Sequence, residues 1–158
     1  MIPKIIYDLK SRYTVLTSEY GDFAQPADFA LFEQENNVII PSDLKDYFIF
    51  FNGTNGEYTD DFFRFYSLRD FKDVEAELSS WSGSPDYSKI TNTLNDAKEF
   101  YVFADFTFNM FSYGIKLGPK LNTSNEVIVI AGSQFRKIAN SFTEFLELYL
   151  SDSYLVQF

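Results

Sequence analysis

Four carboxylates are the side chains of this sequence best able to do chemistry. Residues 56–62, GEYTDDF, bring Glu57, Asp60 and Asp61 together, and Asp105 lies between aromatic residues in FADFTF. Paired carboxylates can hydrolyse a glycosidic bond or bind a hard cation. Neither pattern is specific, because neighbouring acids in a loop are usually solvated and the calcium-loop spacing D-x-[DN]-x-[DN]-G does not occur. Asp105 is expected at a strand end or in a turn.

Missing residue types exclude most of the common catalytic centres. The chain has no His and no Cys. This removes the usual general base at neutral pH, Ser-His-Asp triads, thiol nucleophiles, disulfides and the usual zinc sites. The phosphate-binding motifs G-x-G-x-x-G and G-x-x-x-x-G-K-[ST] are also absent from the sequence. Among enzymes a carboxylate hydrolase remains possible, and no cofactor or metal is expected.

Acidic residues are concentrated in one third of the chain. The net charge is −10, and residues 13–63 contain ten acidic residues and one basic residue, Lys45. Nucleic acids and anionic membranes require clustered Lys and Arg, so neither is expected as a partner. A surface of one sign steers association with an oppositely charged protein, so a basic protein partner is one interpretation. The other is a solvated acidic surface that aids solubility.

Length and aromatic content favour an ordinary globular domain. Phe and Tyr account for 19 and 11 of the 158 residues, which predicts an aromatic core; an exposed aromatic patch for a partner is the alternative. The length suits a single domain over residues 1–158. The N-terminus lacks signal-peptide features, and no apolar run approaches the roughly 20 residues that span a bilayer, so the chain is expected in the cytoplasm.

Two helices are expected near the N-terminus. After a break at Pro26, Phe29 and Phe32 share one face of a short helix, for which Asp28 is a suitable N-cap. The first helix is predicted from apolar residues at helical spacing, which are Ile5, Ile6, Leu9, Tyr13 and Leu16.

A helix between two turns is predicted from the stretch IIPSDLKDYFIFFNGTNGEY. Pro41 ends the preceding segment, and Ser42 or Asp43 can cap the helix. Asn52-Gly53 supplies a left-handed helix ending, and Asn55-Gly56 is a second turn signal. The apolar face of this helix consists of Leu44, Tyr47, Phe48 and Phe51.

The middle of the chain is expected to hold a strand, a capped helix and a loop. Residues 62–66, FFRFY, read as the strand. Ser67 and Asp70 have the spacing of a capping box. Trp81 lies in the loop SSWSGSPDYSK, where we expect it to plug the space beneath the loop; a partner contact is the alternative. The helix between strand and loop is predicted from Leu68, Phe71, Val74 and Leu78.

Strands dominate the C-terminal half. EFYVFADF, NMFSYGIKL and EVIVI are β-branched or aromatic runs separated by polar or Gly/Pro turns. Ser141 and Glu144 then stand at capping-box spacing at the start of SFTEFLELYL. Helices at both ends with strands between them indicate an α+β fold. One face of the second strand holds Asn109, Phe111, Tyr113, Ile115 and Leu117, and one face of the last helix holds Phe142, Phe145, Leu146, Tyr149 and Leu150.

The order of these pieces resembles the SUKH superfamily of bacterial immunity proteins, which also has fungal and viral branches. The resemblance covers residues 29–152. It is carried by an acid-containing helix before IP, the helix LKDYF with its NG ending, an SL-x-x-F helix start after a strand, and the closing SFTEFL. It implies an α+β fold whose central, mostly antiparallel sheet is flanked by N-terminal and C-terminal helices, and it implies no catalysis. The family positions that it places here all have structural explanations; they are Pro41, Leu44, Tyr47, Asn52, Gly53, Ser141 and Phe145.

The resemblance also implies a class of partner. Many members resemble antidotes that bind and neutralise a polymorphic or contact-dependent toxin inside the cell, and the fungal branch resembles a signalling scaffold. With the acidic charge, this leads us to expect a cytoplasmic immunity protein that binds a basic toxin such as a nuclease. A scaffold or regulatory interaction module and a carboxylate hydrolase are the alternatives. The residues expected to contact the partner are Glu57, Tyr58, Asp60 and Asp61, with Asp86 and Tyr87 from the Trp81 loop.

Overall fold

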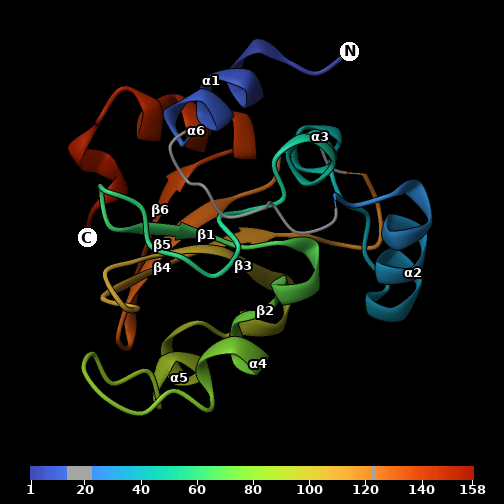
Figure 1. Ribbon diagram of the computed structural model, residues 1–158. Helices are drawn as coiled ribbons and strands as arrows, with labels where there is room; N and C mark the ends of the chain where they lie inside the picture. The colour runs from blue at the N-terminus through green and yellow to red at the C-terminus, as the bar shows by residue number, and fades with distance from the viewer. Residues whose placement is uncertain (14–22, 122–123) are drawn as a thin grey trace.

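A six-stranded sheet forms the centre of the molecule (Figure 1). The computed structural model describes residues 1–13, 23–121 and 124–158. Strands run in the order β1-β3-β4-β5-β6, β2 also pairs with β3, and each of these pairings is antiparallel. The predicted α+β fold with a mostly antiparallel sheet is confirmed. The strands are β1 (Phe63–Phe65), β2 (Lys72–Asp73), β3 (Phe100–Phe106), β4 (Phe111–Lys116), β5 (Val127–Ala131) and β6 (Gln134–Ala139).

Helices cover both faces of the sheet. In Figure 1, α1, α3 and α6 lie above the sheet, α4 and α5 lie below it, and α2 stands at one side. The α-helices are α1 (Lys4–Arg12), α2 (Pro26–Asn36), α3 (Ser42–Phe50), α4 (Val74–Leu78), α5 (Ile90–Thr93) and α6 (Phe142–Leu150). The 3₁₀ turns in the described part of the chain are η1 (Leu68–Asp70), η2 (Ala97–Glu99) and η3 (Tyr154–Val156).

Two hydrophobic cores result, one on each face. Successive residues of a strand point to opposite faces, so Tyr101 and Phe103 of β3 enter the larger core, with residues of α1, α3 and α6. Phe100 and Val102 enter the smaller core, with residues of α4 and α5. Both cores contain buried Phe and Tyr, which confirms the predicted aromatic core.

The helix between two turns forms as predicted. Its four apolar residues, Leu44, Tyr47, Phe48 and Phe51, are fully buried. Asn52 and Gly53 both have left-handed backbone conformations, with φ of 56° and 86°. A Cβ on Gly53 would come within 2.6 Å of the Phe65 carbonyl oxygen, so the close approach of β1 requires glycine here.

The predicted cap of this helix is wrong. Pro41 occupies the N-cap position, and no side chain caps the helix there. Asp43 lies in the first turn of α3, where its carboxylate accepts hydrogen bonds from the backbone N–H and the hydroxyl of Thr143, both at 2.9 Å. Thr143 belongs to the first turn of α6, whose N–H groups lack partners within their own helix. Asp43 therefore joins the starts of two helices.

The helix α2 also begins differently from the prediction. Its N-cap is Gln25, and Pro26 is its first residue, where a missing N–H has no consequence. Asp28 stands three residues after the cap and accepts a hydrogen bond from the Gln25 N–H at 2.7 Å. The expected face is confirmed, since Phe29 is buried and Phe32 packs against the larger core.

The terminal helices lie beside each other above the sheet (Figure 1). The predicted first helix forms as α1, where Ile6 and Leu9 are fully buried and Ile5 is partly buried, whereas Leu16 lies outside the described residues. In α6, the predicted capping residue is confirmed, because the Ser141 hydroxyl accepts a hydrogen bond from the Glu144 N–H at 3.0 Å. Four residues of its predicted apolar face are buried in the larger core, and the fifth, Leu150, packs against that core while only partly buried.

A single helix over residues 68–78 does not form. Leu68–Asp70 make one 3₁₀ turn, Phe71 is extended, and Lys72–Asp73 pair with β3 before α4 begins. Asp73 caps α4 by accepting a hydrogen bond from the Ala76 N–H at 2.9 Å. The apolar spacing that suggested one helix is therefore shared between three short elements, because pairing with β3 interrupts it.

The strands of the C-terminal half are confirmed, with two differences. The second run becomes a strand only at Phe111; residues 107–110 form the turn between β3 and β4. β6 was not predicted, because four of its six residues are exposed and its apolar residues are few. Trp81 is partly buried against the smaller core and donates a hydrogen bond to the Pro85 carbonyl at 2.9 Å, as expected of a plug beneath its loop.

Candidate partner-binding surface

The turn between β3 and β4 has an unusual backbone. Thr107, Phe108 and Asn109 are consecutive left-handed residues, with φ of 45°, 51° and 61°. The turn is closed by a hydrogen bond from the Met110 N–H to the Thr107 carbonyl at 3.0 Å. Phe108 is 68 % exposed and Met110 is 47 % exposed. This end of the sheet therefore presents apolar side chains to solvent.

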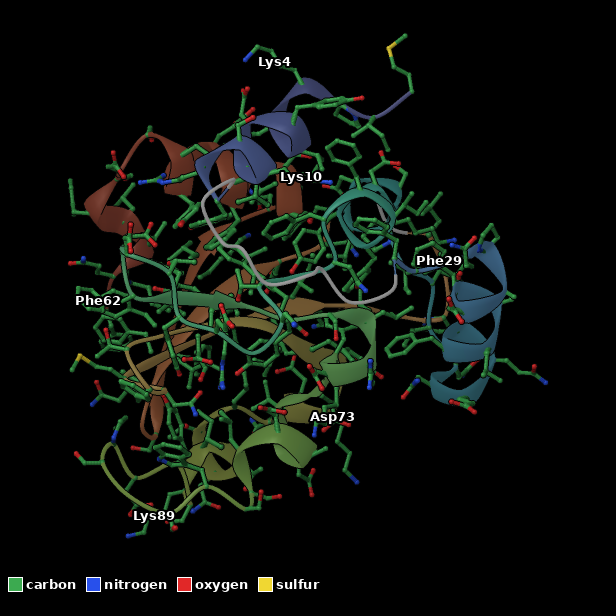
Figure 2. The ribbon with its side chains drawn as sticks, viewed as in Figure 1. Lys4, Lys10, Phe29, Phe62, Asp73 and Lys89 are labelled. Atoms are coloured by element: carbon green, nitrogen blue, oxygen red, sulfur yellow. The ribbon has the colours of Figure 1, made fainter. Side chains whose placement is uncertain are left out.

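Residues 57–62 form a loop next to this turn. Phe62 has φ of 67° and is 58 % exposed, and it lies at the outer edge of the molecule (Figure 2). Its carbonyl accepts a hydrogen bond from the Thr107 N–H at 2.9 Å. The Tyr58 ring stands 4.5 Å from the Phe108 ring, measured between centroids. The loop and the turn thus form one continuous surface.

Asp105 supports this surface from below. It is fully buried on β3, and its carboxylate accepts hydrogen bonds from the Tyr58 and Tyr66 hydroxyls and from Arg64 Nε. The bonds from Arg64 Nε and from the Tyr66 hydroxyl each measure 2.8 Å. The Asn109 N–H adds a fourth at 3.2 Å. Asp105 does lie near a strand end, as expected, but it is a buried hub that ties the loop, β1 and the turn together.

Burial keeps the tyrosines of this hub protonated. It raises the pKa of both Tyr58 and Tyr66 above the ordinary range, and the neighbouring Asp105 carboxylate raises them further, because a phenolate beside a carboxylate is unfavourable. Both hydroxyls therefore remain donors to Asp105 at physiological pH. The Arg64 guanidinium supplies the positive charge, 2.8 Å from the same carboxylate.

Asp61 is tied to the helices above the sheet. Its carboxylate accepts hydrogen bonds from the Tyr149 hydroxyl at 2.6 Å and from the Thr59 hydroxyl. Arg12 of α1 lies 3.6 Å away. Asp61 thus fastens the loop to α1 and α6, whereas its neighbour Asp60 is exposed.

The remaining predicted residues have different positions. Glu57 is exposed in the loop. Asp86 is fully exposed, and the Ser88 N–H donates to its carboxylate at 2.9 Å, which together with the Ser88 side chain lowers the pKa of Asp86. Tyr87 is fully buried, and its hydroxyl donates to the Asn109 carbonyl. Tyr87 therefore supports the turn through the Asn109 carbonyl and has no side-chain surface to offer a partner.

We call the exposed part of this region the rim. Phe62, Phe108 and Met110 were not predicted as site residues. Phe62 and Met110 fell within the predicted strands FFRFY and NMFSYGIKL, and Phe108 fell in the short stretch between EFYVFADF and NMFSYGIKL. The one available signal was Asn109, a residue type that tolerates the left-handed conformation. The rim consists of Glu57, Tyr58, Asp60, Phe62, Phe108 and Met110.

A separate groove of about 660 Å³ lies between α2 and residues 67–71. Its lining includes the acids Asp28, Glu35 and Asp70. Two of them already accept local hydrogen bonds, Asp28 from the Gln25 N–H and Asp70 from the Ser67 hydroxyl at 3.2 Å. These two carboxylates therefore serve the starts of α2 and η1.

Two kinds of site are absent from the described residues. No helix among them has both the length and the apolar composition that crossing a membrane demands. Nor do three or more His, Cys, Asp or Glu side chains converge there in a group that could hold a metal ion.

A family model settles the classification. The model described as SMI1/KNR4 family (SUKH-1) matches residues 24–148, which is most of the chain. The chain belongs to the SMI1/KNR4 family. This confirms the resemblance to the SUKH superfamily, with boundaries a few residues earlier than expected. No curated protein matches the chain significantly.

Within this SMI1/KNR4 chain, the family positions named from sequence lie away from the rim. Leu44, Tyr47 and Phe145 are fully buried, Gly53 is buried beneath β1, and Ser141 caps α6. Tyr47 also donates a hydrogen bond to the Tyr66 carbonyl at 2.6 Å. These positions build the fold, and the rim is a surface on it.

Proposed function

We propose that this chain is a non-catalytic immunity protein that neutralises a basic protein toxin inside the cell that makes it. Membership of the SMI1/KNR4 family supports this class of function. The observation that carries the proposal is the rim. There the exposed aromatic side chains Phe62 and Phe108 lie at one end of the sheet, and the exposed acids Glu57 and Asp60 belong to the same loop as Phe62. Aromatic residues are enriched at protein interfaces, and acidic neighbours favour a basic partner.

The carboxylates of the region suit binding better than catalysis. Asp105 and Asp61 direct their oxygens to donors of their own chain. Glu57 and Asp60 are exposed to solvent, whereas a catalytic acid or base is usually positioned and tuned by burial and neighbouring groups. Such acids can instead steer a basic protein, or occupy positions that phosphates would hold in a nuclease.

Co-expression with the toxins encoded beside this chain tests the proposal. We expect one of them to stop growth alone and to permit growth when this chain is present, and the two purified proteins to form a complex weakened by salt. No rescue by any neighbouring toxin, with no salt-sensitive complex, would sink the proposal. A stable complex with a different, non-toxic protein would favour the scaffold alternative.

Charge reversal tests the role of the rim acids. The double variant Glu57→Lys/Asp60→Lys should slow association with the toxin, most strongly at low salt, because screening acts over about 8 Å at physiological ionic strength. A control with the same change in net charge is Glu35→Lys/Glu147→Lys, which alters exposed acids of α2 and α6. Equal slowing by both variants would show that total charge acts, and not the rim.

A further inference from the structure

Two phenylalanines of the rim hold a backbone conformation that phenylalanine rarely adopts. Phe62 and Phe108 have φ of 67° and 51°. A bulky residue in the left-handed region is an outlier, because its Cβ crowds the backbone, whereas glycine adopts this region freely. Both rings are also mostly exposed, at 58 % and 68 %. Neither feature is what stability alone would favour.

The rings do little for the fold in the part of the chain that the structure describes. Phe62 makes no contact there with another aromatic ring, and Phe108 contacts the ring of Tyr58 alone. The loop and the turn are closed by backbone hydrogen bonds, from the Phe62 N–H to the Thr59 carbonyl and from the Thr107 N–H to the Phe62 carbonyl, both at 2.9 Å. Glycine at position 62 or 108 would preserve every one of these bonds.

We propose that Phe62 and Phe108 are the anchors of the rim, and that they insert into an apolar pocket bordered by Lys or Arg on a partner protein. Strained residues persist where the surrounding structure holds them, and they cluster at functional sites. Aromatic anchors dominate the binding energy of many interfaces. Here the hydrogen bonds that close the loop and the turn fix the backbone that carries both rings before binding, so little backbone freedom is lost when the complex forms.

The flanking charge decides the kind of partner. Glu57 and Asp60 stand in the same loop as Phe62, and the net charge of the chain is −10. Anionic membranes and nucleic acids would be repelled, while a protein surface carrying Lys or Arg around an apolar pocket is complementary. The inference shares its partner class with the proposed function, but its tests do not require a toxin.

The first test compares glycine and alanine at position 62 in the free chain. Urea unfolding should give Phe62→Gly a midpoint at or above that of Phe62→Ala, because glycine removes the backbone strain and alanine keeps it. Leu31, 56 % exposed in α2, is the control. There the order should reverse, since glycine weakens a helix more than alanine does. A midpoint of Phe62→Gly well below wild type and Phe62→Ala would show that the fold needs the phenylalanine, and would overturn the inference.

The second test uses a displayed library of random peptides as the probe. Peptides selected on the wild-type chain should combine a large apolar residue with Lys or Arg. Their affinity should fall by about tenfold or more for the variant Phe62→Gly/Phe108→Gly and stay unchanged for Leu31→Ala. Selection of no peptide that distinguishes these variants would overturn the inference.

Two more measurements separate the outcomes. If a neighbouring toxin binds wild type and the double glycine variant equally, the inference fails while the proposed function stands. If no toxin binds but selected peptides discriminate the variants, the proposed function fails while the inference stands. Binding to vesicles of phosphatidylcholine and phosphatidylglycerol that is lost in the double glycine variant would assign the anchors to a membrane and overturn the inference.

Discussion

Residues 41–53, which we call the corner, and the rim are both rich in aromatic residues, but they use them in opposite ways. In the corner, Tyr47, Phe48 and Phe51 are fully buried, two of them on an ordinary helix and Phe51 at its end. In the rim, Phe62 and Phe108 are mostly exposed and lie in left-handed backbone. Composition cannot distinguish these two uses of phenylalanine. The difference lies in what surrounds the ring.

The two regions are also held together by different forces. The corner depends on ring packing, as between Tyr47 and Phe142, whose centroids are 5.1 Å apart. The rim depends on two carboxylates that accept hydrogen bonds from distant segments. Asp105 is fully buried and Asp61 is half-buried. Changes in packing should therefore damage the corner first, and changes in polar groups should damage the rim first.

Alkaline pH should have the largest effect, and it should act on both regions. Burial raises the pKa of Tyr47, Tyr66, Tyr113 and Tyr149 above the unfolded value of about 10. The raised pKa stabilises the fold fully below pH 10, and this stabilisation is lost as pH rises toward the folded pKa, because only the unfolded chain releases the protons. Each buried tyrosine should lower the free energy of unfolding by roughly 1 kcal/mol per pH unit above about pH 10.

Urea unfolding at a series of alkaline pH values measures this loss, with phenolate absorbance as the second readout. A free energy of unfolding that stays constant while phenolate forms would contradict the predicted burial of these hydroxyls.

Removing one ring should then separate the corner from the rim. Phe48→Ala should lower the free energy of unfolding by about 3–5 kcal/mol, because a fully buried ring leaves a cavity. Phe108→Ala, the same change in the rim, should alter it by about 0.5 kcal/mol or less. Urea unfolding of both variants measures the contrast. A near-neutral Phe48→Ala would show that the corner is not packed as described.

Loss of the buried charge should weaken the support of the rim. Asp105→Asn keeps the shape of the side chain but replaces a carboxylate that accepts bonds from Tyr58, Tyr66 and Arg64. We expect a loss of about 1.5–3 kcal/mol, typical of hydrogen bonds to a charged group. Asp86→Asn, on an exposed loop, is the control and should be close to neutral. Equal stability of the two variants in urea would refute the role of Asp105 as a hub.

The smallest contrast concerns two adjacent acids. Asp61→Ala should cost about 1–2 kcal/mol, because Tyr149 and Thr59 lose their acceptor. Asp60→Ala should change stability by no more than about 0.5 kcal/mol, since Asp60 is exposed. Thermal and urea unfolding would check both. Similar losses at the two positions would mean that the loop is not fastened through Asp61.

Local patterns explain which parts of the fold could be predicted. Three features depend on residues close together in sequence, and all three were confirmed. They are the apolar face of the corner helix, the Ser141 cap and the main strands. Predictions failed where a distant segment intervened. Lys72–Asp73 pair with β3 and divide the expected helix. Asp43 stands in the first turn of α3 and not at its N-cap, and its carboxylate also accepts hydrogen bonds from Thr143 of α6. β6 gave too weak an apolar pattern to be recognised.

The candidate site was predicted only in part, for a related reason. Sequence indicated the acidic loop at residues 57–61, because charge and turn residues are visible directly. It did not reveal that Tyr87 is buried or that Phe62 and Phe108 are exposed. An aromatic residue in a strand-like run looks the same whether it points into the core or stands in a turn.

The sequence by itself determined the apolar faces of the main helices and strands, the α+β class and the SUKH-type order of elements. It also determined the acidic charge and the absence of His and Cys chemistry. Only the tertiary structure decided which acids and aromatic residues face solvent. Asp61 meets Tyr149 across 88 residues, and Tyr58 meets Asp105 across 47. The physical reason is that periodicity records the face on which a residue lies, whereas burial of a polar or aromatic group depends on which distant segment covers it.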